Sequence, residues 1–198
     1  MTGPRNGDLG GLDAPLRRLF AQVAASASGA IPDLPRIGAA LADLASDLDY
    51  MAVWATRLGD RDGNLPMHAP VRGPRLILVH RTEGHMSAVH DHGTWVALSA
   101  VSGLETHRHY RRPADPAGQP DVVEVRSLGP ADTATLLPPD DVHDHGHLAG
   151  HGSPAHVLVL LGDDQTRFER NEWDPATGRH RILRPGDPGR WVSSDPWP

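Results

Sequence analysis

From residue 74 onward, the chain consists of short apolar runs separated by turn-forming stretches. The runs RLILVH, WVALSAV, VVEVRSL, ATLLPP and HVLVLLG alternate with segments rich in Gly, Pro, Asp and Ser. Regularly spaced short strands of this kind predict a β-sandwich or a β-barrel. The 19 prolines and 21 glycines strengthen that expectation, because both residue types interrupt long helices.

The N-terminal part follows a different pattern, with apolar residues three and four positions apart. They form two groups, Leu16, Leu19, Phe20 and Val23, followed by Ile37, Leu41, Leu44 and Leu48. This spacing predicts two or three amphipathic helices, interrupted around Pro32 and Pro35. We therefore expect one structural domain with three parts. These are a helical segment over residues 1–64, a β-barrel over residues 65–175, and an extended C-terminal arm over residues 176–198 that carries Trp191 and Trp197.

Composition narrows the classes of partner and chemistry. The formal charge of −6 comes from 25 acidic and 19 basic residues, which argues against nucleic acid as a partner. The chain has no cysteine, so disulfides, thiolate ligands and cysteine nucleophiles are excluded. The N-terminus lacks a secretory pattern and no apolar run approaches the roughly 18 residues of a membrane span, so we expect a soluble cytoplasmic protein.

Ten of the 13 histidines gather in two stretches, residues 80–109 and 143–151. In the segment VHDHGTW, strand geometry places His90 and His92 on one face, about 7 Å apart at Cα, with Asp91 facing away. Two imidazoles so placed can bind one divalent metal, and PPDDVHDHGH is the natural source of a third ligand. The alternative interpretation is a polar strand face exposed to solvent.

The segment from His90 resembles the first cupin motif, in which a His-x-His pair opens a strand and a glycine, here Gly103, closes the next turn. The segment LLPPDDVHDHGHL resembles the second cupin motif, Pro-x-Gly-x-x-His-x-x-x-Asn, with His143 as its histidine. This resemblance implies a mainly β fold, the cupin double-stranded β-helix or jelly-roll barrel, preceded by N-terminal α-helices and holding a metal in its mouth.

The second motif is imperfect at two positions. Pro138 begins it as expected, but Asp140 stands where the motif has glycine and His147 stands where it has asparagine.

Within the cupins, SAVHDHGTW followed by VSGLETHRHY resembles the cysteine dioxygenase family, in particular its bacterial thiol dioxygenase-like branch. The resemblance covers residues 76–175, about half of the chain. Most cupins add a glutamate four or five residues after the second histidine, where this chain has Val96 and Ala97. The resemblance therefore implies a neutral metal site of three histidines, His90, His92 and His143. His145 is the alternative third ligand.

The resemblance also implies an activity. In the family, Fe(II) and O₂ oxidise a small thiol to a sulfinic acid without an external electron donor. The implied cofactor is Fe(II), although Ni, Zn, Cu or Mn also accepts imidazole ligands. The implied partners are a small-molecule substrate and O₂. From charge and apolar content we expect neither nucleic acid nor a membrane as a partner, and we expect a monomer or a homodimer.

The family's Ser-x-His-x-Tyr triad has no counterpart here. Depending on the register, the matching positions are His156, Leu158 and Leu160, or Val157, Val159 and Leu161. The family's cysteine–tyrosine crosslink is also impossible without cysteine. The catalytic residues therefore stay unassigned, and this apolar strand is interpreted mainly as packed core.

Candidate substrate residues come from the neighbouring segments. Arginines occur where the family binds a carboxylate, namely Arg72, Arg75, Arg167 and Arg170, and each of them could equally be a surface charge. We select Arg170 as a candidate substrate-binding residue. We also select His156, which begins the apolar run HVLVLLG. His107 and Tyr110 follow Gly103, and strand alternation places His107 and His109 on one face and Tyr110 on the other.

Three further hypotheses stay open. One is a cupin enzyme of another reaction class that acts on a small anionic substrate. Another is a cupin that binds a metal or a small ligand without catalysis. A third is a structural β-sandwich whose histidines are incidental.

Overall fold

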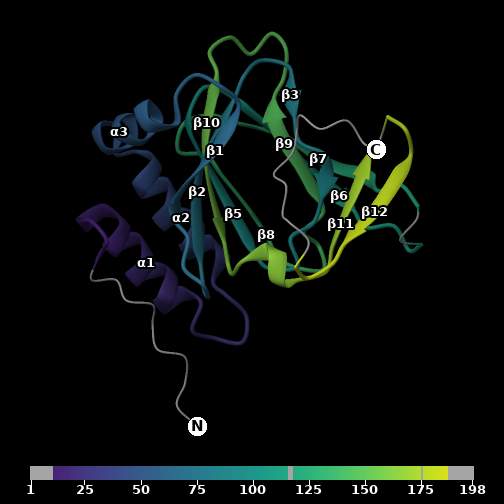
Figure 1. The fold of residues 1–198 in the computed structure, drawn as a ribbon, viewed down its shortest axis with the longest axis horizontal. Helices are drawn as coiled ribbons and strands as arrows, with labels where there is room; N and C mark the ends of the chain where they lie inside the picture. The colour runs from purple at the N-terminus through teal and green to yellow at the C-terminus, as the bar shows by residue number, and fades with distance from the viewer. Residues whose placement is uncertain (1–10, 116–117, 175, 187–198) are drawn as a thin grey trace.

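The computed structural model describes residues 11–115, 118–174 and 176–186. In this part of the chain, three helices precede a body of antiparallel strands (Figure 1). The helices are α1 (Ala14–Ser26), α2 (Leu34–Ala45) and α3 (Leu48–Leu58), and a short 3₁₀ helix, η2 (Gln165–Arg167), comes late in the chain. The strands are β1 (Gly63–His68), β2 (Arg75–Arg81), β3 (His85–Met86), β4 (Val89–His90), β5 (Val96–Ser102), β6 (Glu105–Arg111), β7 (Asp121–Leu128), β8 (Thr133–Leu136), β9 (His143–His147), β10 (Ala155–Leu161), β11 (Arg170–Asp174) and β12 (Arg179–Leu183).

Each α-helix begins at an aspartate whose side chain accepts a hydrogen bond from a backbone N–H of the first turn. These N-caps are Asp13, Asp33 and Asp47. The expected interruption around Pro32 and Pro35 corresponds to residues 27–33, between α1 and α2. Pro35 itself lies in the first turn of α2, where a missing N–H costs no helical hydrogen bond. Leu48 begins α3 and is 65% exposed, so it does not continue the apolar face of α2.

The strands form two antiparallel sheets. Sheet A has the order β1-β2-β10-β5-β8, and sheet B has the order β12-β11-β4-β9-β6-β7, with β3 beside β9. Leaving out the peripheral strands, the chain crosses between the two sheets at every step except the β6–β7 hairpin: β2, β5, β8 and β10 lie in one sheet, and β4, β6, β7 and β9 in the other. This is the jelly-roll order of the double-stranded β-helix, so the predicted fold class is confirmed.

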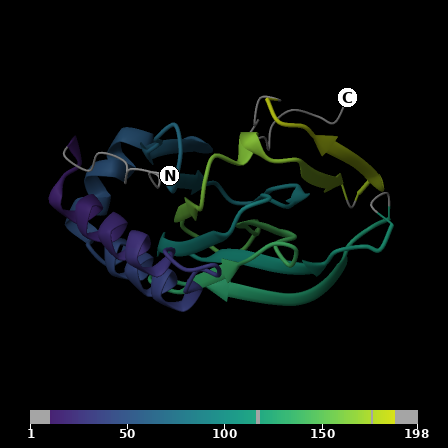
Figure 2. The same ribbon diagram turned by 90° about the horizontal axis from the view of Figure 1, so that it is seen from below.

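Sheet A separates two apolar layers. On its outer side, Leu76, Leu78, Leu158 and Leu160 pack against the buried faces of the three helices. Alternate residues of the same strands, including Val79, Leu98, Val157 and Val159, form a second cluster inside the barrel. Figure 2 shows the helices stacked against one side of the barrel only. Sheet B therefore stays clear of the helices.

The structure differs from the sequence-based description at its two boundaries. The polar link GDRDGNLP was not expected to be a strand, yet β1 begins at Gly63 and pairs with β2. Residues 179–183 were expected in an extended arm but form β12, which pairs with β11 in sheet B. Trp191 and Trp197 lie outside the described residues. Among the helices that are described, none has the length and apolar character to cross a bilayer.

Candidate metal centre

Three histidine rings meet on the inner side of sheet B. His90 ends β4 and stands directly opposite His143, the first residue of β9. His92 lies just beyond the end of β4. The ring centroid of His90 is 4.7 Å from that of His92 and 4.6 Å from that of His143. The ring centroids of His92 and His143 are 5.1 Å apart. The structure thus brings together the three histidines that the two motifs indicated.

The hydrogen bonds of the three rings determine which nitrogen faces the centre. Nδ1 lies 2.9 Å from the Ala88 carbonyl oxygen in His90, 2.7 Å from Gln165 Oε1 in His92, and 2.9 Å from the Asp141 carbonyl oxygen in His143. Oxygens of this type only accept, so each Nδ1 carries the proton and each Nε2 keeps a lone pair. This is the tautomer in which a histidine binds a metal through Nε2.

The Nε2 atoms are arranged as ligands of one ion. Those of His90 and His92 are 3.2 Å apart, close to the separation of two ligands that each lie about 2.0–2.1 Å from one metal. Nε2 of His143 is buried and has no hydrogen-bond partner. One candidate ligand atom from each of the three histidines falls within 4.8 Å of the other two. The donor set therefore fits a divalent cation that accepts imidazole nitrogen.

Electrostatics keep these rings in the metal-binding form. Burial, followed by the neighbouring histidines, holds the pKa of both His92 and His143 well below its usual value. Among the described residues, the candidate ligand group contains no carboxylate. The centre is therefore a face of neutral nitrogen donors, as the absence of glutamate at positions 96 and 97 implied.

A glycine turn positions His92. Gly93 has φ +65°, and a Cβ added to it would lie 2.6 Å from Cβ of Phe168. Only glycine fits this turn without displacing the segment that carries Gln165. The backbone N–H groups of His92 and Gly93 both donate to Asp141 Oδ2, at 3.0 and 3.2 Å.

One arginine joins the two ligand-bearing segments. Arg112 contacts the buried carboxylate of Asp91 at 2.6 Å and that of Asp141 at 3.0 Å. Asp91 lies between the two histidines of the first motif, and it also accepts hydrogen bonds from the backbone and side chain of Asn171. Asp91 was expected to face away from the metal, and it is buried in contacts that support the ligand-bearing segment. The guanidinium holds both segments in one geometry.

Two more histidines line the inner face of sheet B behind the centre. His107 is buried, and its ring stacks at 5.2 Å on His143. Burial lowers the pKa of His107 to about 3, so this ring is neutral. His145 lies farther away, with its ring 6.1 Å from His90, and its Nδ1 is 3.2 Å from Glu105 Oε1. The geometry groups His143, rather than His145, with the His90–His92 pair.

Glu105 is a fully buried carboxyl beneath the histidines. Burial raises its pKa to about 8, although the nearby charge of Arg81 acts in the opposite direction. Burial also holds the pKa of His145 well below its usual value. Both shifts favour uncharged partners, so the contact between Glu105 and His145 is a neutral one at pH 7.

The four candidate substrate residues divide between the two faces of the barrel wall. Arg170 is buried on β11. Glu172, two positions later on the same strand, stands directly opposite His90 on β4. Because residues two positions apart on a strand point to the same face, Arg170 shares the sheet face of His90. The pKa of His92 is lowered mainly by burial and then by His90, and the charge of Arg170 lowers it further. Arg170 and His107 are the two candidates beside the histidine cluster.

Tyr110 and His156 lie elsewhere. Tyr110 faces out of the barrel, where its hydroxyl donates to Asp144 at 3.0 Å within a small cluster that includes Trp173. His156 stacks on His80 at 4.6 Å and bonds to Ser102 Oγ at 2.9 Å, on the side of sheet A that also carries Leu158. Strand alternation thus turns both side chains away from the histidine cluster.

The strand that replaces the triad contributes an apolar wall. Val157, Val159 and Leu161 are buried within the barrel, so the inward register of β10 supplies no hydroxyl and no imidazole. This agrees with the interpretation of the strand as packed core.

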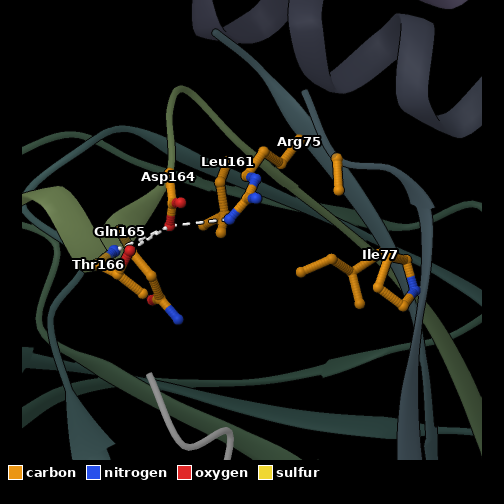
Figure 3. Close-up of a pocket in the computed structure, with 8 residues that line it drawn as sticks. Arg75, Ile77, Leu161, Asp164, Gln165 and Thr166 are labelled. Carbon is orange, nitrogen blue, oxygen red and sulfur yellow. Dashed lines mark hydrogen bonds and ion pairs between the residues drawn. The ribbon is translucent and has the colours of Figure 1, made fainter. Parts of the chain in front are cut away.

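A cavity of about 160 Å³ adjoins the centre through Gln165. Figure 3 shows the Gln165 side chain on one side of this space and Ile77 on the other, with Arg75 and Asp164 along its upper margin. Arg75 and Asp164 form an ion pair of 2.8 Å. Since Gln165 also contacts His92, it connects the cavity wall with a candidate ligand. Neither Gln165 nor Arg112 stands in a motif, so sequence inspection did not identify them.

No protein-family model matches the chain, and no curated protein matches it. Among solved structures, the DMSP lyase DddQ from Ruegeria pomeroyi DSS-3 is 17% identical, over 55% of this chain and 50% of that chain, with a TM-score of 0.39. The present chain thus spans half the length of that lyase. A protein with a double-stranded β-helix domain from Klebsiella pneumoniae is 14% identical, over 63% of this chain and 85% of that chain, with a TM-score of 0.40.

An RmlC-like cupin family protein from Methanocaldococcus jannaschii is 10% identical, over 55% of this chain and 86% of that chain, with a TM-score of 0.41. Likeness of this extent carries no argument about activity. The fold assignment rests on the strand order of the chain itself.

Replacing Arg112 should weaken metal binding. In Arg112→Gln, the link between Asp91 and Asp141 is lost, and we expect the Kd for Fe(II) or Co(II) to rise about 10–100-fold. Anaerobic titration calorimetry measures this change. Arg111→Gln is the matched control, because Arg111 is the exposed neighbour. Unchanged affinity in a folded Arg112→Gln protein would show that the guanidinium does not support the ligands.

Glu105 should make the free energy of unfolding depend on pH. Its pKa is about 8 when folded and about 4.3 when unfolded, so between these values the folded state holds a proton that the unfolded chain releases. The free energy of unfolding therefore falls as pH rises through this window. In urea denaturation, the free energy of unfolding of Glu105→Gln should rise relative to that of the wild type as the pH increases from about 5 to about 8. The exposed control Glu169→Gln should show no such pH-dependent difference. Parallel curves for wild type and Glu105→Gln would contradict the expectation.

Proposed function

We propose that this protein is a metal-dependent cupin enzyme, and specifically a non-haem Fe(II) dioxygenase that oxidises the sulfur of a small thiol to a sulfinic acid. His90, His92 and His143 would hold the metal. The observation that carries the proposal is the convergence of three Nε2 atoms whose Nδ1 partners are all oxygen acceptors. When bound, Fe(II) would supply the site for thiolate coordination and O₂ activation.

The charge of the donor set favours an anionic substrate. Three neutral imidazoles leave both positive charges of a divalent metal uncompensated, whereas a site of two histidines and one carboxylate is already partly neutralised. Opposite the histidines, sheet A presents buried side chains such as Val79, Leu98 and Val159. In these surroundings of low polarity, attraction between the centre and a thiolate is stronger than it is in water.

Residues of the chain would also orient the substrate. Arg170 shares the face of His90, and its guanidinium can bind a carboxylate through two parallel hydrogen bonds. His107 is neutral, stacks on His143, and has a buried Nε2 without a hydrogen-bond partner. That nitrogen can donate to or accept from a substrate group in the barrel. The adjoining cavity of about 160 Å³ is smaller than the roughly 300–1,000 Å³ of sites for drug-sized ligands, which favours a small substrate.

A second candidate function has one observation in its favour. The inward side chains of β10 are Val157, Val159 and Leu161, where the cysteine dioxygenase family has its polar triad. A cupin enzyme of another reaction class, using the same metal face on a small anionic substrate, would not need those polar groups. A cupin that binds a metal or a small ligand without catalysis would not need them either.

Metal content and oxygen uptake together test the proposal. We expect protein purified without a polyhistidine tag and loaded with Fe(II) to contain one iron per chain, and to consume O₂ in proportion to added small thiol. His90→Ala, His92→Ala and His143→Ala should each lose the iron, because the remaining two imidazoles hold a metal weakly. His151→Ala is the control.

Elemental analysis and an oxygen electrode give the two readouts. Retained iron in all three alanine variants would reject the metal site. Bound iron without thiol-dependent uptake would reject the dioxygenase and favour the second candidate.

Arg170 should affect substrate binding more than metal binding. In Arg170→Gln, we expect KM for a carboxylate-bearing thiol to rise about tenfold or more, since a charge-assisted pair is lost, while iron content is kept. Steady-state oxygen uptake measures KM and kcat separately. The control is Arg167→Gln, which alters an exposed arginine that pairs with Asp163. An unchanged KM in Arg170→Gln would assign carboxylate recognition to other residues.

A further inference from the structure

Strand β7 ends sheet B with an unusually exposed edge. It pairs with β6 on one side, and no described strand pairs with its other side. All of its residues from Asp121 to Ser127 are exposed. Three of them are valines, with exposed fractions of 51% for Val122, 45% for Val123 and 60% for Val125. In Figure 2, this strand runs along the lower margin of the barrel.

Such an edge is a template for further strand pairing. It is eight residues long, rich in β-branched residues, and free of the proline and lysine with which proteins usually protect sheet edges. The other sheet edges differ. At the two edges of sheet A, β1 contains Pro66 and β8 has only four residues, and at the far edge of sheet B, β12 has only five residues. The exposed valines therefore point to β7 as the pairing edge.

We propose that β7 pairs antiparallel with β7 of a second copy of this chain, forming a twofold homodimer in which the two B sheets become continuous. A twofold interface brings the same strand from both copies together, as antiparallel pairing of one segment with itself requires. This inference is independent of the metal centre and of its proposed chemistry.

The charges of the strand favour one register. With Val125 on the twofold axis, Glu124 of each copy stands opposite Arg126 of the other, so two ion pairs flank a valine–valine contact. With Glu124 on the axis, two glutamates would face each other, and with Arg126 on the axis, two arginines would do so. Like charges directly opposite each other destabilise a strand pair. The sequence VVEVRS is thus complementary to itself about Val125.

The pairs fall on consistent faces of the extended sheet. Glu124 stands opposite His109 on β6, and Arg126 stands opposite His107, so both side chains lie on the inner face of sheet B. Val125 stands opposite Arg108 and lies on the outer face. Directly opposed residues of an antiparallel pair share a face, so Glu124 can reach Arg126 of the other copy without rotation of either strand.

Charge reversal tests the pairing and its register together. We expect the full-length chain to dimerise reversibly in sedimentation velocity over the micromolar range. E124R places two arginines opposite each other at both pairs, and R126E does the same with two glutamates. Each single variant should therefore weaken the dimer by about tenfold or more. The double variant E124R/R126E restores opposite charges and should recover most of the affinity.

Mixing the two single variants gives a second, independent readout. E124R and R126E are complementary to each other, so their mixture should form heterodimers more tightly than either variant forms homodimers. E169R is the control, because Glu169 is an exposed glutamate away from β7. Circular dichroism verifies that each variant is folded.

Three results would overturn the proposal. One is a wild-type chain that stays monomeric at every concentration, which would leave the β7 edge for a different partner. Another is a dimer that both single variants leave intact, which would place the interface elsewhere. The third is a double variant as weak as the single ones, which would reject the register about Val125.

Discussion

The two inner faces of the barrel have opposite chemistry, and the structure around the candidate metal centre depends on how they are filled. Sheet A contributes aliphatic side chains such as Val79 and Val159, while sheet B contributes imidazoles. Burying a ring nitrogen costs free energy unless it is bonded. The Nδ1 atoms of His90, His92 and His143 are satisfied by oxygens of the protein, and their Nε2 atoms converge. A divalent cation would satisfy all three Nε2 atoms at once.

The support of this centre reaches well beyond the ligands. Asp91 and Asp141 are neighbours of ligand histidines in the sequence, but their shared partner Arg112 comes from the segment after β6. Gln165 comes from η2 and fixes the proton of His92. The ligand geometry is thus set by segments that enter the barrel from different strands, as is usual where surrounding hydrogen bonds orient metal-binding histidines.

Much of the fold could be predicted from the sequence, because its signals are local. The apolar runs of β2 and β10 and the helical spacing of Leu16 to Val23 each report burial of one element. The two histidine motifs likewise preserve spacing within a short segment. Arg112 and Gln165 could not be found in this way, since their roles depend on packing between distant segments. Strand β12 was missed because its five residues, RHRIL, show no alternation of apolar and polar side chains. Tyr110 and His156 were assigned to a substrate site without knowing which face of each strand lines the barrel.

The helices cover only the outer side of sheet A, and this asymmetry has a consequence for local stability. Strands β2, β5 and β10 are buried on both faces, whereas β3 and β4 are two-residue strands with few backbone hydrogen bonds. Segments with little buried apolar surface open at a lower free-energy cost than the central strands of a core. Backbone amides around the first histidine pair should therefore exchange with solvent much faster than those of sheet A. A metal held by His90, His92 and His143 would link the two-residue strand β4 to the fully buried strand β9 within sheet B, and it would therefore raise the free-energy cost of opening this segment.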